Sequence, residues 1–111
     1  MYLYFELWKP KPAWDDVSRE QRQEFLNQLR AGTRKMEELG VELVGFAICD
    51  KAASHSGDFR YMVAWKMPNL GHVHMLEKAV QSEGWYNYFD VTNARGKLTS
   101  LEEAAVDMVR I

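Results

Sequence analysis

The first eight residues alternate in a way that predicts a β-strand with two bulky rows. Leu3, Phe5 and Leu7 form an apolar row, which we expect to cover the core. The row on the opposite face is almost as bulky and includes one acid; it consists of Tyr2, Tyr4, Glu6 and Trp8. Because a face exposed to water seldom carries so many rings, we expect this second row to have a cover of its own.

The rest of the chain predicts three more strands and three helices. The first helix begins at Ser18, in a capping-box pattern, and ends at Gly40. The second covers residues 70–83 with Asn69 as its N-cap, and the third begins at Ser100. Strands are predicted at 41–49, 59–66 and 85–92, a loop at 50–58 and a type I turn at 93–96.

This order, βαββαβ followed by a helix, is the ferredoxin-like pattern of an α+β fold. In that pattern both crossover helices cover one face of a four-stranded antiparallel sheet, so the other face needs a separate cover. The chain shows no internal repeat and no linker. We therefore expect a single domain over residues 1–111.

The composition is that of a globular protein with many aromatic residues. Hydrophobic side chains make up 47% and charged ones 27%, and the chain has four Trp, five Tyr and five Phe. A net charge of -2 without a basic cluster argues against binding to nucleic acid or to a membrane surface. No apolar run is long enough for a membrane span, and a single cysteine, Cys49, fits a reducing compartment. We expect a cytoplasmic protein.

The aromatic side chains are expected to gather on the uncovered face of the sheet. Tyr4 and Trp8 would be joined there by Tyr61, Trp65 and Tyr88 from later strands. A second copy of the chain is the partner that we expect, because a two-fold axis lets one apolar face serve both molecules. Two twisted sheets stacked in this way leave gaps at their ends, so each subunit should contain a pocket.

The element order and two segments resemble the dimeric α/β-barrel superfamily. The segments are MYLYFELWKPKPAW at the start of the chain and GWYNYF, which begins at Gly84. The superfamily includes antibiotic-biosynthesis-type monooxygenases, heme-degrading monooxygenases, polyketide cyclases and stress-responsive barrel proteins. The resemblance, closest to the first and last of these groups, implies a dimeric α/β barrel, a homodimer joined through the open sheet face.

Trp65 and a histidine on the helix at 70–83 are similar to a pair in the heme-degrading enzymes. Those enzymes also need an asparagine on the first strand, where this sequence has Glu6, so heme is not expected. His72 and His74 point about 200° apart on a helix and do not predict a metal site. The sequence has no phosphate-binding loop and no dinucleotide glycine motif. We therefore expect no cofactor and no metal.

Three residues are candidates for acid–base catalysis. His72 falls on the inward face near a helix N-terminus, which keeps an imidazole neutral and able to act as a base; it could also be a structural histidine at the core edge. Glu6 lies among rings that would raise its pKa, unless Arg22 or Arg95 neutralises it. Asp90 resembles Glu6 but lies near the end of a strand, where carboxylates often meet water.

The leading hypothesis is a cofactor-independent enzyme that acts on a small aromatic or polyketide-like molecule. His72 or Glu6 would take a proton next to a carbonyl, which leads either to cyclisation or isomerisation or to oxygenation by O2. Residues expected to bind the substrate are Tyr4, Trp8, Tyr61, Trp65, Tyr88 and Arg22. The alternative is a non-catalytic ligand-binding or stress-response module, and the two differ in whether Glu6 is free and the pocket is empty.

Overall fold

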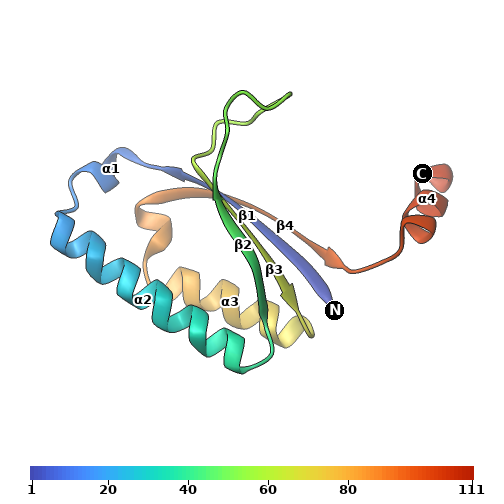
Figure 1. Cartoon of the computed structure of the whole chain (residues 1–111), viewed down its shortest axis with the longest axis horizontal. Helices are drawn as coiled ribbons and strands as arrows, with labels where there is room; N and C mark the ends of the chain where they lie inside the picture. The colour runs from blue at the N-terminus through green and yellow to red at the C-terminus, as the bar shows by residue number, and fades with distance from the viewer.

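The computed structural model describes residues 1–111 as one antiparallel sheet with two long helices on one face (Figure 1). The elements are β1 (Tyr2–Pro10), α1 (Pro12–Asp15), α2 (Arg19–Glu38), β2 (Glu42–Ile48), β3 (Tyr61–Met67), α3 (Leu70–Ser82), the 3-10 helix η1 (Trp85–Asn87), β4 (Phe89–Lys97) and α4 (Leu101–Arg110). The strand order is β2-β3-β1-β4. The prediction of an α+β fold is confirmed, and the arrangement is compatible with a ferredoxin-like fold.

The predicted helix boundaries agree closely with the structure. Ser18 and Gln21 form the capping box of α2, and Gly40 follows that helix with φ +92°, a value that favours glycine. Asn69 caps α3 by accepting a hydrogen bond from the backbone N–H of His72. Ser100 caps α4 in the same way. Side-chain caps are local interactions, so the sequence alone identifies them.

The predicted fourth strand, 85–92, is present but begins later than expected, and the predicted turn at 93–96 is wrong. Gly84, with φ +82°, starts the short helix η1, and β4 begins only at Phe89. Residues 93–96 continue β4 as far as Lys97, where it pairs with Tyr2. The ladder of hydrogen bonds to β1 outweighs the local turn preference of Asn and Gly here. The four-residue helix α1 was not predicted either.

The orientation predicted for β1 is also wrong, because its aromatic row faces the helices. Tyr4 and Glu6 are buried, Glu6 with 3% of its surface exposed, whereas Phe5 is 41% exposed. Tyr61 and Trp65 are paired opposite Trp8 and Tyr4, and therefore lie on the same helix-covered face. The larger rings remove more apolar surface from water and fill the space between sheet and helices better than Leu3, Phe5 and Leu7 would.

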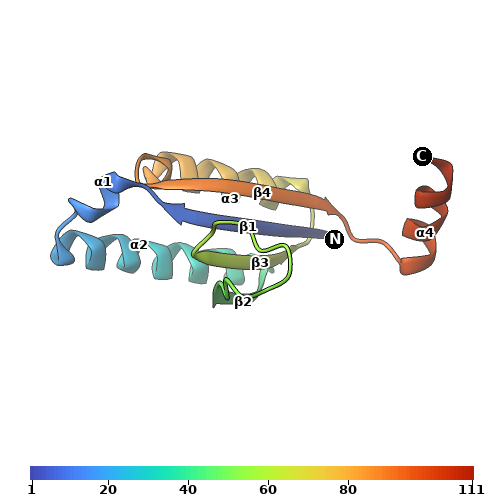
Figure 2. The same cartoon turned by 90° about the horizontal axis from the view of Figure 1, so that it is seen from above.

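The face of the sheet away from the helices is therefore apolar but not aromatic-rich. Phe5, Leu7 and Met62 stand on it, and the residues beside them are mostly small. These small neighbours are Gly45, Ala47, Ala64, Ala94 and Gly96. No element of the chain covers this surface, which we call the open face (Figures 1 and 2).

Edge strand β2 is exposed and irregular. Val44, Phe46 and Ile48 are apolar side chains with more than half of their surface in water. The pairing of β2 with β3 shifts between Leu43 and Gly45, which marks a β-bulge. The strand therefore presents an apolar edge that is interrupted near its start.

Helix α4 stands apart from the rest of the chain. It lies beyond the end of β4, on the side of the sheet opposite to α2 and α3 (Figure 1). Leu101, Ala105, Met108 and Val109 form an apolar stripe along it, and Val109 is 86% exposed. The chain itself gives this stripe no partner.

None of the helices combines the length and the apolar character needed to cross a membrane. The longest, α2, has an alternation of charged and polar residues over most of its surface.

Replacing Met67 by Ala should destabilise the fold strongly. Met67 has 0% of its surface exposed, so the substitution leaves a cavity and costs about 2–5 kcal/mol. Met75→Ala is the matched control, because Met75 is 46% exposed and its loss should cost less than about 0.5 kcal/mol. Urea unfolding of both variants measures the difference; equal losses would contradict the core described above.

Candidate functional site

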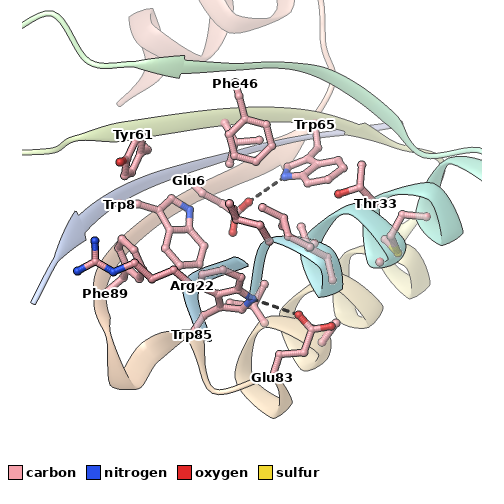
Figure 3. A pocket seen from close by; sticks show the side chains of 18 of the residues that line it. Glu6, Trp8, Arg22, Thr33, Phe46, Tyr61, Trp65, Glu83, Trp85 and Phe89 are labelled. Atoms are coloured by element: carbon pink, nitrogen blue, oxygen red, sulfur yellow. Dashed lines mark hydrogen bonds between the residues drawn. The ribbon is translucent and has the colours of Figure 1, made fainter. Parts of the chain in front are cut away.

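A cavity of about 480 Å³ lies between the sheet and the two long helices. Its walls are mainly aromatic and aliphatic side chains from β1, β3, α2 and α3 (Figure 3). The aromatic members are Trp8, Trp14, Phe46, Tyr61, Trp65, Trp85 and Phe89, and the polar ones are Glu6, Arg22, Thr33 and Glu83. An apolar cavity of this size with a few polar groups is typical of a site for a small organic molecule.

Glu6 is the buried polar group of this cavity. Trp65 Nε1 donates a hydrogen bond of 2.8 Å to Glu6 Oε2, and the carboxyl group reaches from β1 into the space between the labelled rings (Figure 3). Burial raises the pKa of Glu6 to about 7, although the Trp65 hydrogen bond acts in the opposite direction. A carboxyl with this pKa can accept or donate a proton near neutral pH.

Neither arginine that could neutralise Glu6 forms an ion pair with it. Arg22 donates from Nε to Val17 O at 3.1 Å and from Nη2 to Trp14 O at 2.8 Å. Its guanidinium carbon lies 5.2 Å from the centre of the Trp14 ring. Arg95 instead lies 3.9 Å from Glu77. Of the two alternatives for Glu6, the structure therefore shows the unpaired one.

A second carboxyl, Glu83, lines the same cavity and also accepts from an indole. It follows the last turn of α3, and Trp85 Nε1 donates to Glu83 Oε2 at 3.1 Å. Sequence analysis missed Glu83, since nothing in its local pattern distinguishes it from a solvated acid at a helix end. The pairing with Trp85 depends on the short helix η1, which follows Gly84 and was not predicted.

The aromatic side chains at one end of the cavity contact each other. Trp8 packs edge-on against Trp85 at 5.9 Å and against Phe89 at 5.5 Å between ring centres. Trp14, which α1 supplies, lies 4.9 Å from Phe89 and 5.8 Å from Phe25. Offset and edge-to-face contacts of this kind fix ring positions, so this wall is pre-formed.

Five of the nine residues predicted for the site line the cavity. They are Glu6, Trp8, Arg22, Tyr61 and Trp65. They come together because alternate positions of β1 and β3 face α2, which supplies Arg22. The prediction placed the four strand residues on an open face; they share a face as predicted, but that face is covered by the chain's own helices.

The other four predicted residues do not line the cavity. His72 Nδ1 lies 2.9 Å from Asn69 Oδ1 at the start of α3, which matches the structural role for this histidine. Asp90 is exposed, 3.8 Å from Lys11 Nζ. Tyr4 donates a hydrogen bond of 3.1 Å to Glu77, and Tyr88 packs against Trp14 outside the cavity.

No group of three or more His, Cys, Asp or Glu side chains lies close enough together to hold a metal ion. The charged groups that line the cavity are two acids, Glu6 and Glu83, and one arginine, Arg22.

A comparison with protein families matches the chain over residues 1–111 to the Family of unknown function (DUF6616). The chain belongs to this family. No curated protein matches it. Membership of DUF6616 assigns no activity, so the chemistry of this DUF6616 chain has to be inferred from the cavity itself.

The stability of this DUF6616 protein should fall as pH rises from 5 to 8. Between the unperturbed pKa of 4.5 and the folded value of about 7, the folded chain keeps a proton on Glu6 that the unfolded chain has lost. The protonated folded state is therefore favoured at low pH, and the loss by pH 8 is about 2–3 kcal/mol.

Glu6→Gln should lack this part of the pH dependence, because its amide does not titrate. Urea unfolding of both proteins at pH 5 and pH 8 measures the difference. If the unfolding free energies of the two proteins change equally with pH, the pKa of Glu6 is not raised.

Proposed function

We propose that the cavity binds a small, flat, largely apolar molecule and that Glu6 transfers a proton to or from it, without a cofactor. The observation that carries this proposal is the unpaired Glu6 carboxyl, whose pKa is about 7, in a cavity of about 480 Å³. General bases are most effective when their pKa lies near the working pH. Groups with such shifted values are concentrated at functional sites.

Each side chain of the site has a part in this reaction. Glu6 accepts a proton from the carbon next to a carbonyl of the substrate, which leaves an enolate, and returns the proton to a second atom. The rings of Trp8, Tyr61 and Trp65 hold the flat substrate against the sheet. The indole N–H of Trp65 fixes the position of the carboxyl. Isomerisation or cyclisation follows from this step. With a methylene substrate, the carbanion could instead add O2 to give a hydroperoxide, which loses water and leaves a carbonyl; the substrate then supplies all the electrons, one oxygen atom enters the product and the other leaves as water.

We also propose that the working form is a homodimer in which two open faces meet, as in a dimeric α/β barrel. Phe5 and Met62 lie exposed on a surface whose small neighbours allow a second sheet to approach closely. Unlike the aromatic face that the sequence suggested, this surface leaves the cavity intact when it is covered. A two-fold axis would let this one face serve both copies.

Helix α4 provides a second argument for the homodimer. It rises on the side of the open face and reaches past the end of the sheet (Figure 1), so its stripe can contact a molecule seated there. Leu101, Met108 and Val109 together offer apolar area that the chain itself leaves in water. Two protomers related by two-fold symmetry would each extend one such helix over the other.

We place the protein in a reducing compartment, the cytoplasm, as a further part of this proposal. Its single cysteine, Cys49, is free and half-buried. A chain with one unpaired thiol fits an environment in which thiols stay reduced.

Glu6→Gln should remove proton transfer while leaving binding in place. The probe is 2-acetylnaphthalene, a flat ketone, whose exchange of methyl protons for deuterium in D2O is followed by NMR. We expect the wild type to accelerate exchange and Glu6→Gln to lower the rate by about 10²–10⁴-fold. Tryptophan fluorescence measures binding of the same probe.

Asp90→Asn is the control for this assay, because Asp90 is an exposed carboxylate outside the cavity and its loss should not change the exchange rate. Equal exchange in wild type and Glu6→Gln would contradict the role of Glu6. Binding without any accelerated exchange would favour the alternative, a module that only holds its ligand.

Met108→Lys should dissociate the homodimer. A lysine in the apolar stripe of α4 would be buried without a partner, so we expect the dissociation constant to rise about 100-fold or more. Asp107→Lys is the matched control, since it places the same side chain on the polar side of the same helix. Sedimentation velocity at micromolar concentration reports both. A monomeric wild type would refute the dimer, and equal effects of the two lysines would refute the contact made by α4.

A further inference from the structure

The polar side chains that line the cavity differ in charge and in whether contacts within the chain already occupy them. Glu6 and Glu83 each present a carboxyl group whose Oε2 accepts from an indole. Arg22 is the cationic side chain of the lining, and Thr33 and Tyr61 each add one hydroxyl. The cavity therefore offers mainly hydrogen-bond acceptors to a ligand.

Arg22 is already engaged by the chain. Its Nε and Nη2 groups donate to the carbonyl oxygens of Val17 and Trp14, and its guanidinium lies over the Trp14 ring. These contacts direct the guanidinium towards the turn between α1 and α2. An anion placed beside Glu6 would meet a carboxyl group rather than this guanidinium.

The aromatic walls of the cavity also favour a cationic ligand over an anionic one. The face of an aromatic ring carries partial negative charge and attracts cations, most strongly in Trp. Four Trp side chains line the cavity: Trp8, Trp14, Trp65 and Trp85. Rings and carboxyls together form the kind of surroundings that stabilise a positive charge out of water.

We infer that the ligand of this cavity is a flat aromatic molecule with a protonated amine, held between the Trp rings and the carboxyls of Glu6 and Glu83. The inference rests on the proposed function, since it names the ligand class of the same site. It also limits the substrates to those whose charged group is a donor, and it excludes aromatic carboxylates.

Binding of such a cation should depend on the protonation of Glu6. The other titratable and charged groups near Glu6 are Arg22 on α2, Glu83 after α3, Glu77 on α3, Arg95 on β4, and the phenols of Tyr4, Tyr61 and Tyr86. Burial raises the pKa of Tyr4 and of Tyr86, so these two phenols stay neutral through neutral pH. Glu6, whose pKa is about 7, changes charge between pH 6 and 8.

Three probes of the same ring system and different charge test the inference. They are 2-naphthylmethylamine, 2-naphthalenemethanol and 2-naphthoate, and binding is measured by calorimetry and tryptophan fluorescence at pH 6 and pH 8. We expect the amine to bind at least about tenfold more tightly than the carboxylate at pH 8. Its affinity should rise between pH 6 and pH 8 as Glu6 loses its proton.

Glu6→Gln and Glu83→Gln should each weaken the amine about five-fold or more and change the affinity for the alcohol about two-fold or less. Glu6→Gln should also remove the pH dependence. Asp90→Asn should leave all three affinities unchanged. Equal or tighter binding of 2-naphthoate would overturn the inference and leave the proposed pocket standing. If none of the three probes binds, both the inference and the proposed function are refuted.

Discussion

The hydrogen bond from Trp65 to Glu6 is the interaction on which the interior of this protein depends. A carboxyl group in an apolar layer is costly unless a donor satisfies it or it keeps its proton. Glu6 uses both, since Trp65 Nε1 donates to one oxygen and burial favours the neutral acid. The rings at one end of the cavity are fixed by edge-on contacts of Trp8 with Trp85 and Phe89. The cavity and the core thus share one layer.

Local signals allowed much of the fold to be predicted. The caps at Ser18, Asn69 and Ser100 act within one helical turn, and alternation over β1 reveals a strand whatever its surroundings. Local signals do not show which of the two side-chain rows of a strand faces the core. Both rows of β1 are bulky, so alternation alone could not decide between Tyr4 and Phe5 for the core. The helices decide which row is buried, because the space between them and the sheet is filled better by the large rings than by the other row.

The candidate site was predictable to the extent that its residues lie on strands. Glu6, Trp8 and Trp65 share a face by simple parity, and the prediction grouped them correctly although it chose the wrong side. Trp14 and Glu83 were missed because they come from segments that long-range packing places: a single helical turn, and the junction before η1. His72 and Asp90 looked chemically suitable, but their backbones put them elsewhere.

The bulge at the start of β2 limits how other chains can pair with this edge of the sheet. An exposed apolar edge strand is a template on which a strand from another chain could extend the sheet without limit. The shift between Leu43 and Gly45 breaks the even spacing of backbone groups that such growth requires. Side-by-side polymerisation through this edge is thereby discouraged.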